Sequence, residues 1–350
     1  MTRLFDPLKL GELTVPNRIF MAPLTRSRAG VERIPNRLMA QYYAQRAGAG
    51  LIMSEATVVS PMGIGYADTP GIWSQEQVEG WKLITHAVHE AGGRIFLQLW
   101  HVGRISDPLF LHGALPVAPS AIAAKGHVSL LRPQKPYETP RALESTEIPS
   151  IVEAFRKGAQ NAQIAGFDGV ELHGANGYLL DQFLQNGSNA RRDEYGGSVQ
   201  NRARLMLQAV DAAISVWGPG RVGVHLAPRG DAHSMGDSDL PGTFEHVARE
   251  LGARRVAFIC AREYIGPDRI GPRLKAAFGG VYVVNEKFDF ESATHALEVG
   301  EADAVAFGKL FIANPDLPRR FELRAPFNEP KVPQFYFGGA EGYTDYPTLE

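Results

Sequence analysis

Three polar side chains that can take part in acid–base or hydrogen-bond chemistry lie close together in the sequence, at His173, Asn176 and Tyr178. They directly follow an apolar segment, 169–172, and are interspersed with glycines, which allow the chain to turn tightly. A strand that ends in such a turn can present polar groups at the rim of a pocket. A lone His in this setting is more often a buried, satisfied residue, so it is the clustering that favours a functional site.

The elements that must hold these residues follow a repeating order of short apolar and longer amphipathic segments, which predicts strands alternating with helices. Such alternation is typical of a parallel sheet. The predicted strands are 18–22, 50–55, 94–99, 169–172, 222–226, 255–259, 280–284 and 304–307. The predicted helices include 75–91, 151–165, 201–217, 240–251 and 290–299. This order predicts an α/β fold, a single (β/α)8 TIM barrel, whose chemistry lies at the C-terminal ends of the strands.

Two segments fall outside this alternation. Residues 108–145 contain six prolines and little periodicity, which predicts a long excursion after the third strand, either a lid or a small hairpin over the barrel mouth. Residues 321–350 are rich in Pro, Gly and Tyr, which predicts a C-terminal tail that wraps across the surface and is no core helix. Because no segment resembles a linker, we expect the whole chain, 1–350, to form one domain.

Composition excludes several classes of protein. The net charge is -2 and the pI is near 6.6, so the chain has no basic footprint for nucleic acid or an anionic membrane. The single cysteine, Cys260, excludes an internal disulfide framework, a Cys-rich zinc site and a cysteine-ligated iron–sulfur cluster. Because we find neither a signal-like N-terminus nor an apolar run that could span a bilayer, we expect a soluble cytoplasmic protein. A small-molecule substrate and a monomer or homodimer are expected.

A glycine-rich run, 218–223, matches the pattern of dinucleotide-binding loops but occurs in the wrong context. That pattern must follow a strand and begin a helix, whereas 218–223 follows a helix and begins a strand. Gly308 and Lys309 instead follow the eighth strand, where TIM barrels commonly bind a phosphate through backbone N–H groups. This position indicates a phosphorylated ligand, and the competing interpretation of Lys309 is an ordinary surface lysine.

Five longer motifs occur in order along the chain, and shorter ones at 4–7, 16–19 and 339–347 extend the pattern to both ends. The five are Met-Ala-Pro-Leu-Thr-Arg at 21–26, Gln-Leu-Trp-His-Val-Gly-Arg at 98–104, His-x-x-Asn-x-Tyr at 173–178, Arg-Asp-Glu-Tyr-Gly-Gly-Ser at 192–198 and Phe-Ile-Ala-Asn-Pro-Asp-Leu at 311–317. Together they resemble the old yellow enzyme family of FMN-dependent NAD(P)H ene reductases. The resemblance covers essentially the whole chain.

The resemblance implies that FMN binds at the C-terminal face of the barrel. Thr25 matches the residue that bonds flavin O4, and Gln98 matches the glutamine that bonds the pyrimidine edge, where a neutral amide can both donate and accept. The implied cofactor contacts are Pro23, Leu24, Thr25, Ala56, Gln98, His225, Gly308 and Lys309.

The resemblance also implies the catalytic roles. His173 and Asn176 match the pair that binds the substrate oxygen, and Tyr178 matches the proton donor. The implied substrate contacts are Tyr66, Trp100, His173, Asn176 and Tyr336. The implied reaction is ping-pong: NADPH or NADH reduces the flavin, and an α,β-unsaturated carbonyl or nitro compound then receives hydride from flavin N5 and a proton from Tyr178. No metal is implied.

Three departures from the family pattern bear on the cofactor. His225 stands where the family has an arginine near flavin N1 and O2, so we expect a lower reduction potential, with Arg229 as a candidate substitute. Asn285 and Glu286 stand at a usual glycine pair, where Glu286 would repel a phosphate unless it points away. Lys309 replaces a usual arginine and keeps only its charge. Together these changes predict looser FMN retention.

Two other functions stay open on the sequence alone. A flavin-poor barrel could bind small carbonyl compounds without turnover, because the altered positions all belong to the cofactor site. A metal-dependent hydrolase could use His101, His173 and His225 from neighbouring strand ends. The hydrolase is the weaker alternative, because no His pair follows the first strand and no acidic ligand follows the eighth.

Overall fold

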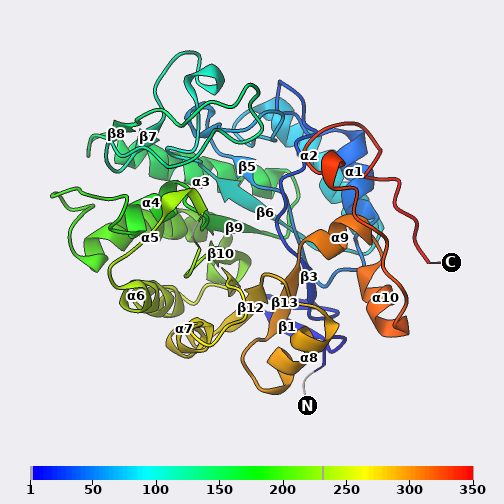
Figure 1. Ribbon diagram of the computed structural model, residues 1–350. Helices are drawn as coiled ribbons and strands as arrows, with labels where there is room; N and C mark the ends of the chain where they lie inside the picture. The colour runs from blue at the N-terminus through cyan, green and yellow to red at the C-terminus, as the bar shows by residue number, and fades with distance from the viewer. Residues whose placement is uncertain (1–2, 231, 350) are drawn as a thin grey trace.

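A closed parallel barrel surrounded by helices forms the centre of the computed structural model, which describes residues 3–230 and 232–349 (Figure 1). Of the predicted domain, 1–350, residues 1, 2, 231 and 350 therefore lie outside the described residues. Of the predicted tail, 321–350, only the last residue does. The barrel strands are β3 Ile19–Met21, β4 Ile52–Met53, β6 Ile95–Trp100, β9 Gly169–Gly174, β10 Val222–Leu226, β11 Phe258–Arg262, β12 Val281–Asn285 and β13 Ala304–Phe307. They pair in chain order, and β13 closes the ring on β3. The predicted (β/α)8 fold is confirmed.

Helices cover the outside of this barrel (Figure 1). They are α1 Arg37–Ala44, α2 Gln75–Glu90, α3 Ile148–Ile164, α4 Leu179–Leu184, α5 Val199–Trp217, α6 Leu240–Ala253, α7 Gly271–Phe278, α8 Phe290–Glu298, α9 Lys309–Ala313 and α10 Leu317–Leu323. The five predicted helices correspond to α2, α3, α5, α6 and α8, with ends that differ by at most three residues. The others have eight residues or fewer, too few for a clear helical period in the sequence. In the described part of the chain, no helix has the length and apolar character needed to cross a membrane.

Local signals determine where the longer helices begin and end. Ser74 and Gln77 form a capping box at the start of α2, so side chains satisfy N–H groups that the first turn leaves free. Asp239 accepts a bond from the N–H of Gly242 at the start of α6 (3.0 Å). Gly166 follows α3 with φ 86°, a left-handed conformation that favours glycine and turns the chain toward β9. These caps fix where each following strand enters the barrel.

The interior of the barrel is filled from its N-terminal end. Phe20, Phe96 and Phe258 belong to one buried cluster inside the ring. Leu10 and Val15 join that cluster from an antiparallel hairpin formed by β1 Leu8–Leu10 and β2 Leu13–Val15. Because the hairpin and the phenylalanines fill this end, a ligand can enter the barrel only from the C-terminal ends of the strands.

One barrel strand lies later in the chain than predicted. Strand β11 spans Phe258–Arg262, whereas the sequence predicted 255–259. After α6 the chain still has to turn, and Arg255 takes part in that turn with φ 56°, a conformation that cannot continue into a strand. The shift puts Cys260 inside the barrel beside His225 and puts Arg262 at the C-terminal end of the strand.

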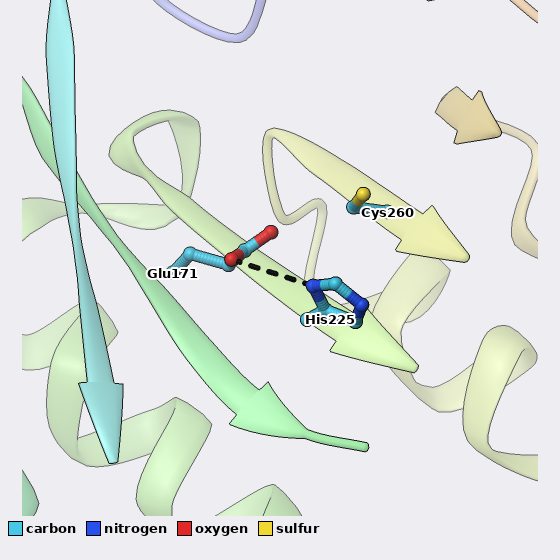
Figure 2. Close-up of side chains that lie close together, drawn as sticks. All are labelled: Glu171, His225 and Cys260. Atoms are coloured by element: carbon cyan, nitrogen blue, oxygen red, sulfur yellow. Dashed lines mark ion pairs between the residues drawn. The ribbon is translucent and has the colours of Figure 1, made fainter. Parts of the chain in front are cut away.

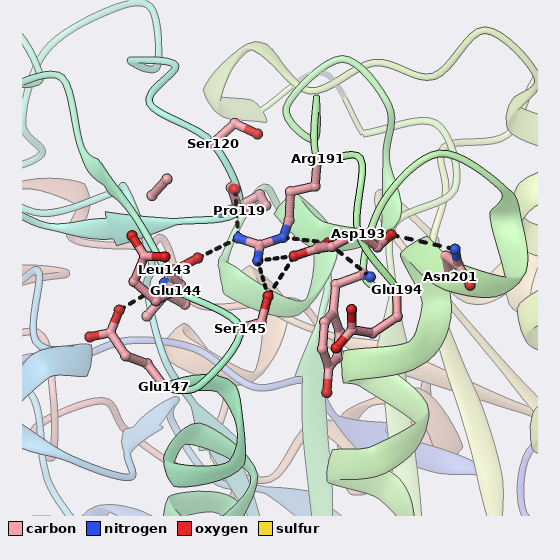
Figure 3. A network of polar contacts seen from close by, with 12 residues as sticks. Pro119, Ser120, Leu143, Glu144, Ser145, Glu147, Arg191, Asp193, Glu194 and Asn201 are labelled. Atoms are coloured by element: carbon pink, nitrogen blue, oxygen red, sulfur yellow. Dashed lines mark hydrogen bonds and ion pairs between the residues drawn. The ribbon is translucent and has the colours of Figure 1, made fainter.

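The excursion after β6 is attached to the barrel body at its base. It contains a short parallel pair, β7 Val117–Ala118 and β8 Arg141–Ala142, together with the 3-10 turn Pro108–Phe110. Figure 3 shows that Arg191 donates to the main-chain oxygens of Pro119 (3.1 Å) and Leu143, and to Ser145 Oγ (3.2 Å). The same guanidinium pairs with Asp193, and these hydrogen bonds hold the pKa of that carboxyl far below its usual range. One partly buried arginine therefore ties two segments of the excursion, at Pro119 and at Leu143 to Ser145, to the loop between α4 and α5.

The C-terminal tail wraps back over the barrel as predicted, but it is not confined to the surface. Tyr343 is fully buried and stacks on Tyr42 of α1, with ring centroids 4.1 Å apart. Arg26 donates to the main-chain oxygens of Phe335 (2.9 Å) and Gly342 (2.8 Å). In Figure 1 the tail, in red, runs beside α1. The expectation that the tail contains no core helix is wrong at its start, because Phe321 lies in α10 and is buried in the main core. Beyond α10, stacked aromatic rings and a buried arginine supply most of the packing.

Candidate functional site

A cavity of about 700 Å³ opens at the C-terminal ends of the barrel strands, a volume typical of ligand and cofactor sites. Most of the residues predicted to bind a ligand line it: Pro23, Leu24, Thr25, Tyr66, Asn176, Tyr178, His225, Gly308, Lys309 and Tyr336. The remaining predicted residues are buried: Ala56, Gln98, Trp100 and His173. We name two parts of the site after the ligand group that the family resemblance predicts for each. Tyr66, Trp100, His173, Asn176 and Tyr178, in or next to the cavity wall, form the oxygen-binding end, named after a substrate oxygen. The part formed by Glu286, Lys287, Gly308 and Lys309 is the phosphate end.

At the oxygen-binding end, Tyr178 is surrounded by aromatic rings. Its hydroxyl lies 2.8 Å from the hydroxyl of Tyr66, and either oxygen can be the donor. The rings of His173 and Trp100 meet the ring of Tyr178 edge-on, with centroids 4.9 and 5.0 Å away. Burial, and then the nearby Tyr66, raise the pKa of Tyr178 well above its ordinary value of 10. Tyr178 is therefore a protonated phenol at neutral pH, held in position by its neighbours.

His173 is the penultimate residue of β9 and lies directly beside His225 on β10, with the two rings stacked and their centroids 5.5 Å apart. Burial lowers the pKa of His173 well below 6.5, and the neighbouring His225 acts in the same direction. The ring is thus neutral at physiological pH and can donate one hydrogen bond without carrying a charge. Its Nδ1 is buried and has no partner among the described residues.

Asn176 lies in the tight turn between β9 and α4. Its φ of 59° is a left-handed conformation, which Asn tolerates better than most residues. His233 Nδ1 donates to the main-chain oxygen of Asn176 (2.6 Å), and Arg262 Nη1 donates to its side-chain Oδ1 (2.9 Å). These two hydrogen bonds therefore fix the backbone and the side-chain amide of Asn176 at the cavity wall.

Inside the barrel, below the cavity, Glu171, His225 and Cys260 project from three neighbouring strands (Figure 2). Gln98 Nε2 donates to Glu171 Oε2 (2.7 Å), and His225 Nδ1 lies 3.7 Å from the same oxygen. The potential ligand atoms of this trio lie within 4.8 Å of one another, which raises the question of a metal. Burial, and then the adjacent Glu171, raise the pKa of the Cys260 thiol well above 9, so this thiol is protonated when no metal is bound.

The same trio leaves hydrogen-bonding capacity for a polar ligand. His225 lines the cavity, and its Nε2 is buried without a partner in the part of the chain that the structure describes. Glu171 Oε1 is likewise buried and unpartnered there. Because an unpaired buried polar atom is costly, a ligand with complementary donors and acceptors would be stabilised here. The pyrimidine edge of a flavin has this complementary character.

At the phosphate end, Lys309 and Lys287 are exposed and line the cavity. Glu286, a possible source of repulsion, is paired: its Oε2 lies 2.7 Å from Arg262 Nε. Glu286 and Lys287 have φ of 100° and 59°, conformations that favour glycine. Of the two positions where the resemblance implies glycines, Glu286 has a glycine-like backbone and Asn285 does not. Because Glu286 is paired, its carboxylate is no free negative charge.

Arg229, the candidate substitute for the strand-five arginine, does not line the cavity. Arg229 Nε donates to Glu263 Oε1 (2.7 Å), and the guanidinium also pairs with Asp268, so these carboxylates hold it outside the cavity lining. Arg262 lines the cavity instead. In the sequence, Arg262 is the polar residue just beyond the end of the predicted strand 255–259, but the family resemblance implied no contact for it. The available signal was an arginine at the end of the strand next to His225.

The histidines proposed for a hydrolase do not form a metal site. Among the described residues, the group with metal-ligating geometry is Glu171, His225 and Cys260, and it does not include His101 or His173. His101 accepts a bond from the N–H of Gly103 at Nδ1 (3.1 Å), and burial lowers its pKa to about 3. The arrangement therefore gives no support to a three-histidine hydrolase.

Comparison with known proteins identifies the family. The model of the NADH:flavin oxidoreductase / NADH oxidase family matches residues 3–328. A solved structure of an old yellow enzyme homologue from Zymomonas mobilis has a TM-score of 0.97 and is 45% identical, covering 99% of this chain and 100% of that one. The chain belongs to the old yellow enzyme family.

Other members of the old yellow enzyme family match as completely. Morphinone reductase in complex with tetrahydroNAD has a TM-score of 0.97 and 48% identity, covering 100% of this chain and 98% of that one. A probable flavin mononucleotide-dependent alkene reductase of Leishmania infantum is 41% identical over 99% of this chain and 97% of its own. A putative 12-oxophytodienoate reductase of Oryza sativa is also 41% identical, over 99% of this chain and 94% of its own. This chain is thus an oxidoreductase of an FMN-dependent family.

The residues of the cavity fit FMN. One side offers His225 Nε2, which has no partner among the described residues, for the pyrimidine edge, and the phosphate end offers Lys287 and Lys309 for an anion. The volume is large enough for a cofactor together with a small ligand. FMN and the substrate would therefore share one cavity, whose two ends differ in chemistry.

Proposed function

We propose that this protein uses NADH or NADPH, through bound FMN, to reduce the activated C=C bond of α,β-unsaturated carbonyl and nitro compounds in a ping-pong cycle. The observation that carries the proposal is the convergence of a protonated Tyr178, a neutral His173 and a fixed Asn176 at one end of the cavity. The relatives named as an alkene reductase and as 12-oxophytodienoate reductases support this class of substrate.

FMN would be held by Thr25 and the neighbouring main chain on one side, by Gln98 and His225 at the pyrimidine edge, and by Gly308 and Lys309 at the phosphate. When bound, it supplies hydride chemistry between a nicotinamide and the substrate β-carbon. Because both reactants would use the same end of the cavity, the nicotinamide must leave before the substrate enters. A ping-pong cycle follows from that shared space.

His173 and Asn176 would bind the carbonyl or nitro oxygen through two N–H donors. Negative charge develops on this oxygen as the β-carbon accepts hydride, so both hydrogen bonds strengthen in the transition state. The low pKa of His173 keeps its ring neutral, so the site does not depend on the protonation of an imidazole near neutral pH.

Tyr178 would supply the proton to the α-carbon. Burial keeps its phenol protonated, and the bond to Tyr66 fixes the hydroxyl. The edge-on contact with Trp100 further restricts the ring. A phenol held in this way can act as a general acid at a fixed point in the cavity.

The test is a visible absorption spectrum of the purified protein before and after addition of FMN. We expect oxidised-flavin bands that disappear with NADPH or NADH and return when cyclohexenone is added, with a chelator making no difference. The rates with the two nicotinamides decide which one is preferred. A protein that takes up no FMN would instead support the flavin-poor barrel that binds carbonyl compounds without turnover.

A further inference from the structure

Arg262 is a charged residue of the cavity that the proposed function has not used. It ends β11, the strand that pairs with β10, and its side chain is 35% exposed and lines the cavity. On β10 the position that carries arginine in the family is His225. Arg262 therefore brings a guanidinium into the cavity from the neighbouring strand.

This guanidinium makes hydrogen bonds along two of its edges. On one side Nε lies 2.7 Å from Glu286 Oε2, and Nη2 donates to Glu286 Oε1 (3.2 Å). This two-point pairing fixes the plane of the group, as a single contact would not. On the other side Nη1 donates to Asn176 Oδ1 (2.9 Å). Glu286, Arg262 and Asn176 thus form a chain of contacts that crosses from the phosphate end to the oxygen-binding end.

The contact with Arg262 decides which way the Asn176 amide faces. A guanidinium has only donors, so the atom of Asn176 that meets it must be the carbonyl oxygen and not the NH2 group. The NH2 group is then left to face a ligand, which suits a substrate oxygen because that oxygen can only accept. Hydrogen bonding from a charged group to the amide oxygen also polarises the amide and strengthens its N–H donors.

We propose that Arg262, anchored by Glu286, is a positioning residue that orients the Asn176 amide for binding of the substrate oxygen. The proposal rests on the proposed function, in which Asn176 binds that oxygen. It also gives Glu286 a role: the carboxylate that replaces a phosphate-loop glycine holds the arginine that orients the amide.

A double-mutant cycle on ligand binding tests the proposal. The probe is phenol, whose oxygen can accept the same hydrogen bonds, and its binding to the FMN-loaded protein is measured by calorimetry. We expect R262M to weaken phenol binding about tenfold, the size expected for loss of an orienting hydrogen bond to a charged group. N176A should weaken it at least as much, and the R262M/N176A double variant should bind no more weakly than N176A. Additive losses would show that Arg262 acts independently of Asn176 and would overturn the proposal.

Three further variants make the cycle specific. R254M removes a guanidinium that pairs with Asp211 on the outer helices, away from the cavity lining, and should leave phenol binding unchanged. R262K keeps a donor-only cation without the fork and should recover part of the affinity lost in R262M. E286Q removes the anchor and should fall between wild type and R262M. An E286Q protein that binds phenol like wild type would exclude Glu286 as the anchor.

FMN occupancy and enone turnover of the wild type are measured first, so that the two proposals fail separately. If the wild type binds FMN and reduces cyclohexenone but the losses are additive, only the role of Arg262 is refuted. If the wild type takes up no FMN, the proposed function is refuted, and the same cycle is run by calorimetry on phenol binding to the flavin-free protein. In the flavin-free protein, non-additive losses would support the contact between Arg262 and Asn176, and additive losses would refute it.

Discussion

Tyr66, His173 and Tyr178 at one end of the cavity are buried and neutral, whereas Lys287 and Lys309 at the other end are exposed and charged. At the oxygen-binding end, burial lowers the pKa of His173 and raises the pKa of Tyr178. Both side chains therefore stay uncharged over a wide pH range. At the phosphate end, charges lie near solvent, where water screens them. Replacing a side chain should therefore reduce activity more at the oxygen-binding end than it reduces FMN binding at the phosphate end.

The largest effect is expected for Y178F. Removal of the phenol hydroxyl should slow reoxidation of the reduced protein by cyclohexenone about hundredfold, the usual size for loss of a general acid, without slowing reduction by NADPH or NADH. Stopped-flow absorption measures the two half-reactions separately. Y66F is the matched control: it removes the hydrogen-bond partner of Tyr178 but not the proton, so a smaller loss is expected. Reoxidation of Y178F at the wild-type rate would mean that water supplies the proton.

The second effect is a loss of stability in acid, caused by the neutral histidine that follows Trp100. His101 has a pKa of about 3 in the folded protein, against 6.5 when unfolded. Between these values the unfolded state binds more protons, so stability falls as the pH is lowered through this range. At pH 5, burial of neutral His101 lowers the free energy of unfolding by about 2 kcal/mol relative to alkaline pH.

H101Q tests that contribution, because glutamine does not titrate. Denaturant unfolding of wild type and H101Q at pH 7 and pH 5 gives the pH-dependent change for each protein. We expect the change to be smaller in H101Q, whatever the stability of the variant at pH 7. Equal changes in the two proteins would show that burial of His101 contributes nothing to the acid sensitivity.

The smallest effect is expected at the phosphate end. K309M should weaken FMN binding about tenfold, because it removes one charged contact to a phosphate that backbone N–H groups also bind. Equilibrium dialysis of FMN measures the change, and K309R should bind FMN at least as tightly as wild type. The comparison of the two ends would fail if K309M abolished FMN binding while Y178F left turnover intact.

Local patterns in the sequence were enough to predict much of this protein. The alternation of apolar and amphipathic segments predicted a barrel, because strand and helix periods depend on residues close together in the chain. The cluster at His173, Asn176 and Tyr178 could be read in the same way, since one strand and one turn hold all three. The fit of the family motifs then pointed to the cofactor.

Contacts between distant residues were decided only by closure of the barrel. Tyr66 and Tyr178 are 112 residues apart, and Arg262 and Asn176 are 86 apart, yet each pair is in hydrogen-bond contact. Arg262 could be placed near the end of its strand from the sequence, but its contacts with Asn176 and Glu286 could not. The sequence by itself predicted the eight barrel strands and the five longer helices, with ends that differ by a few residues from those of the structure. The directions of Arg262, Asn176 and Glu286 were decided by tertiary structure, because a side chain turns toward the partners that neighbouring strands bring to it.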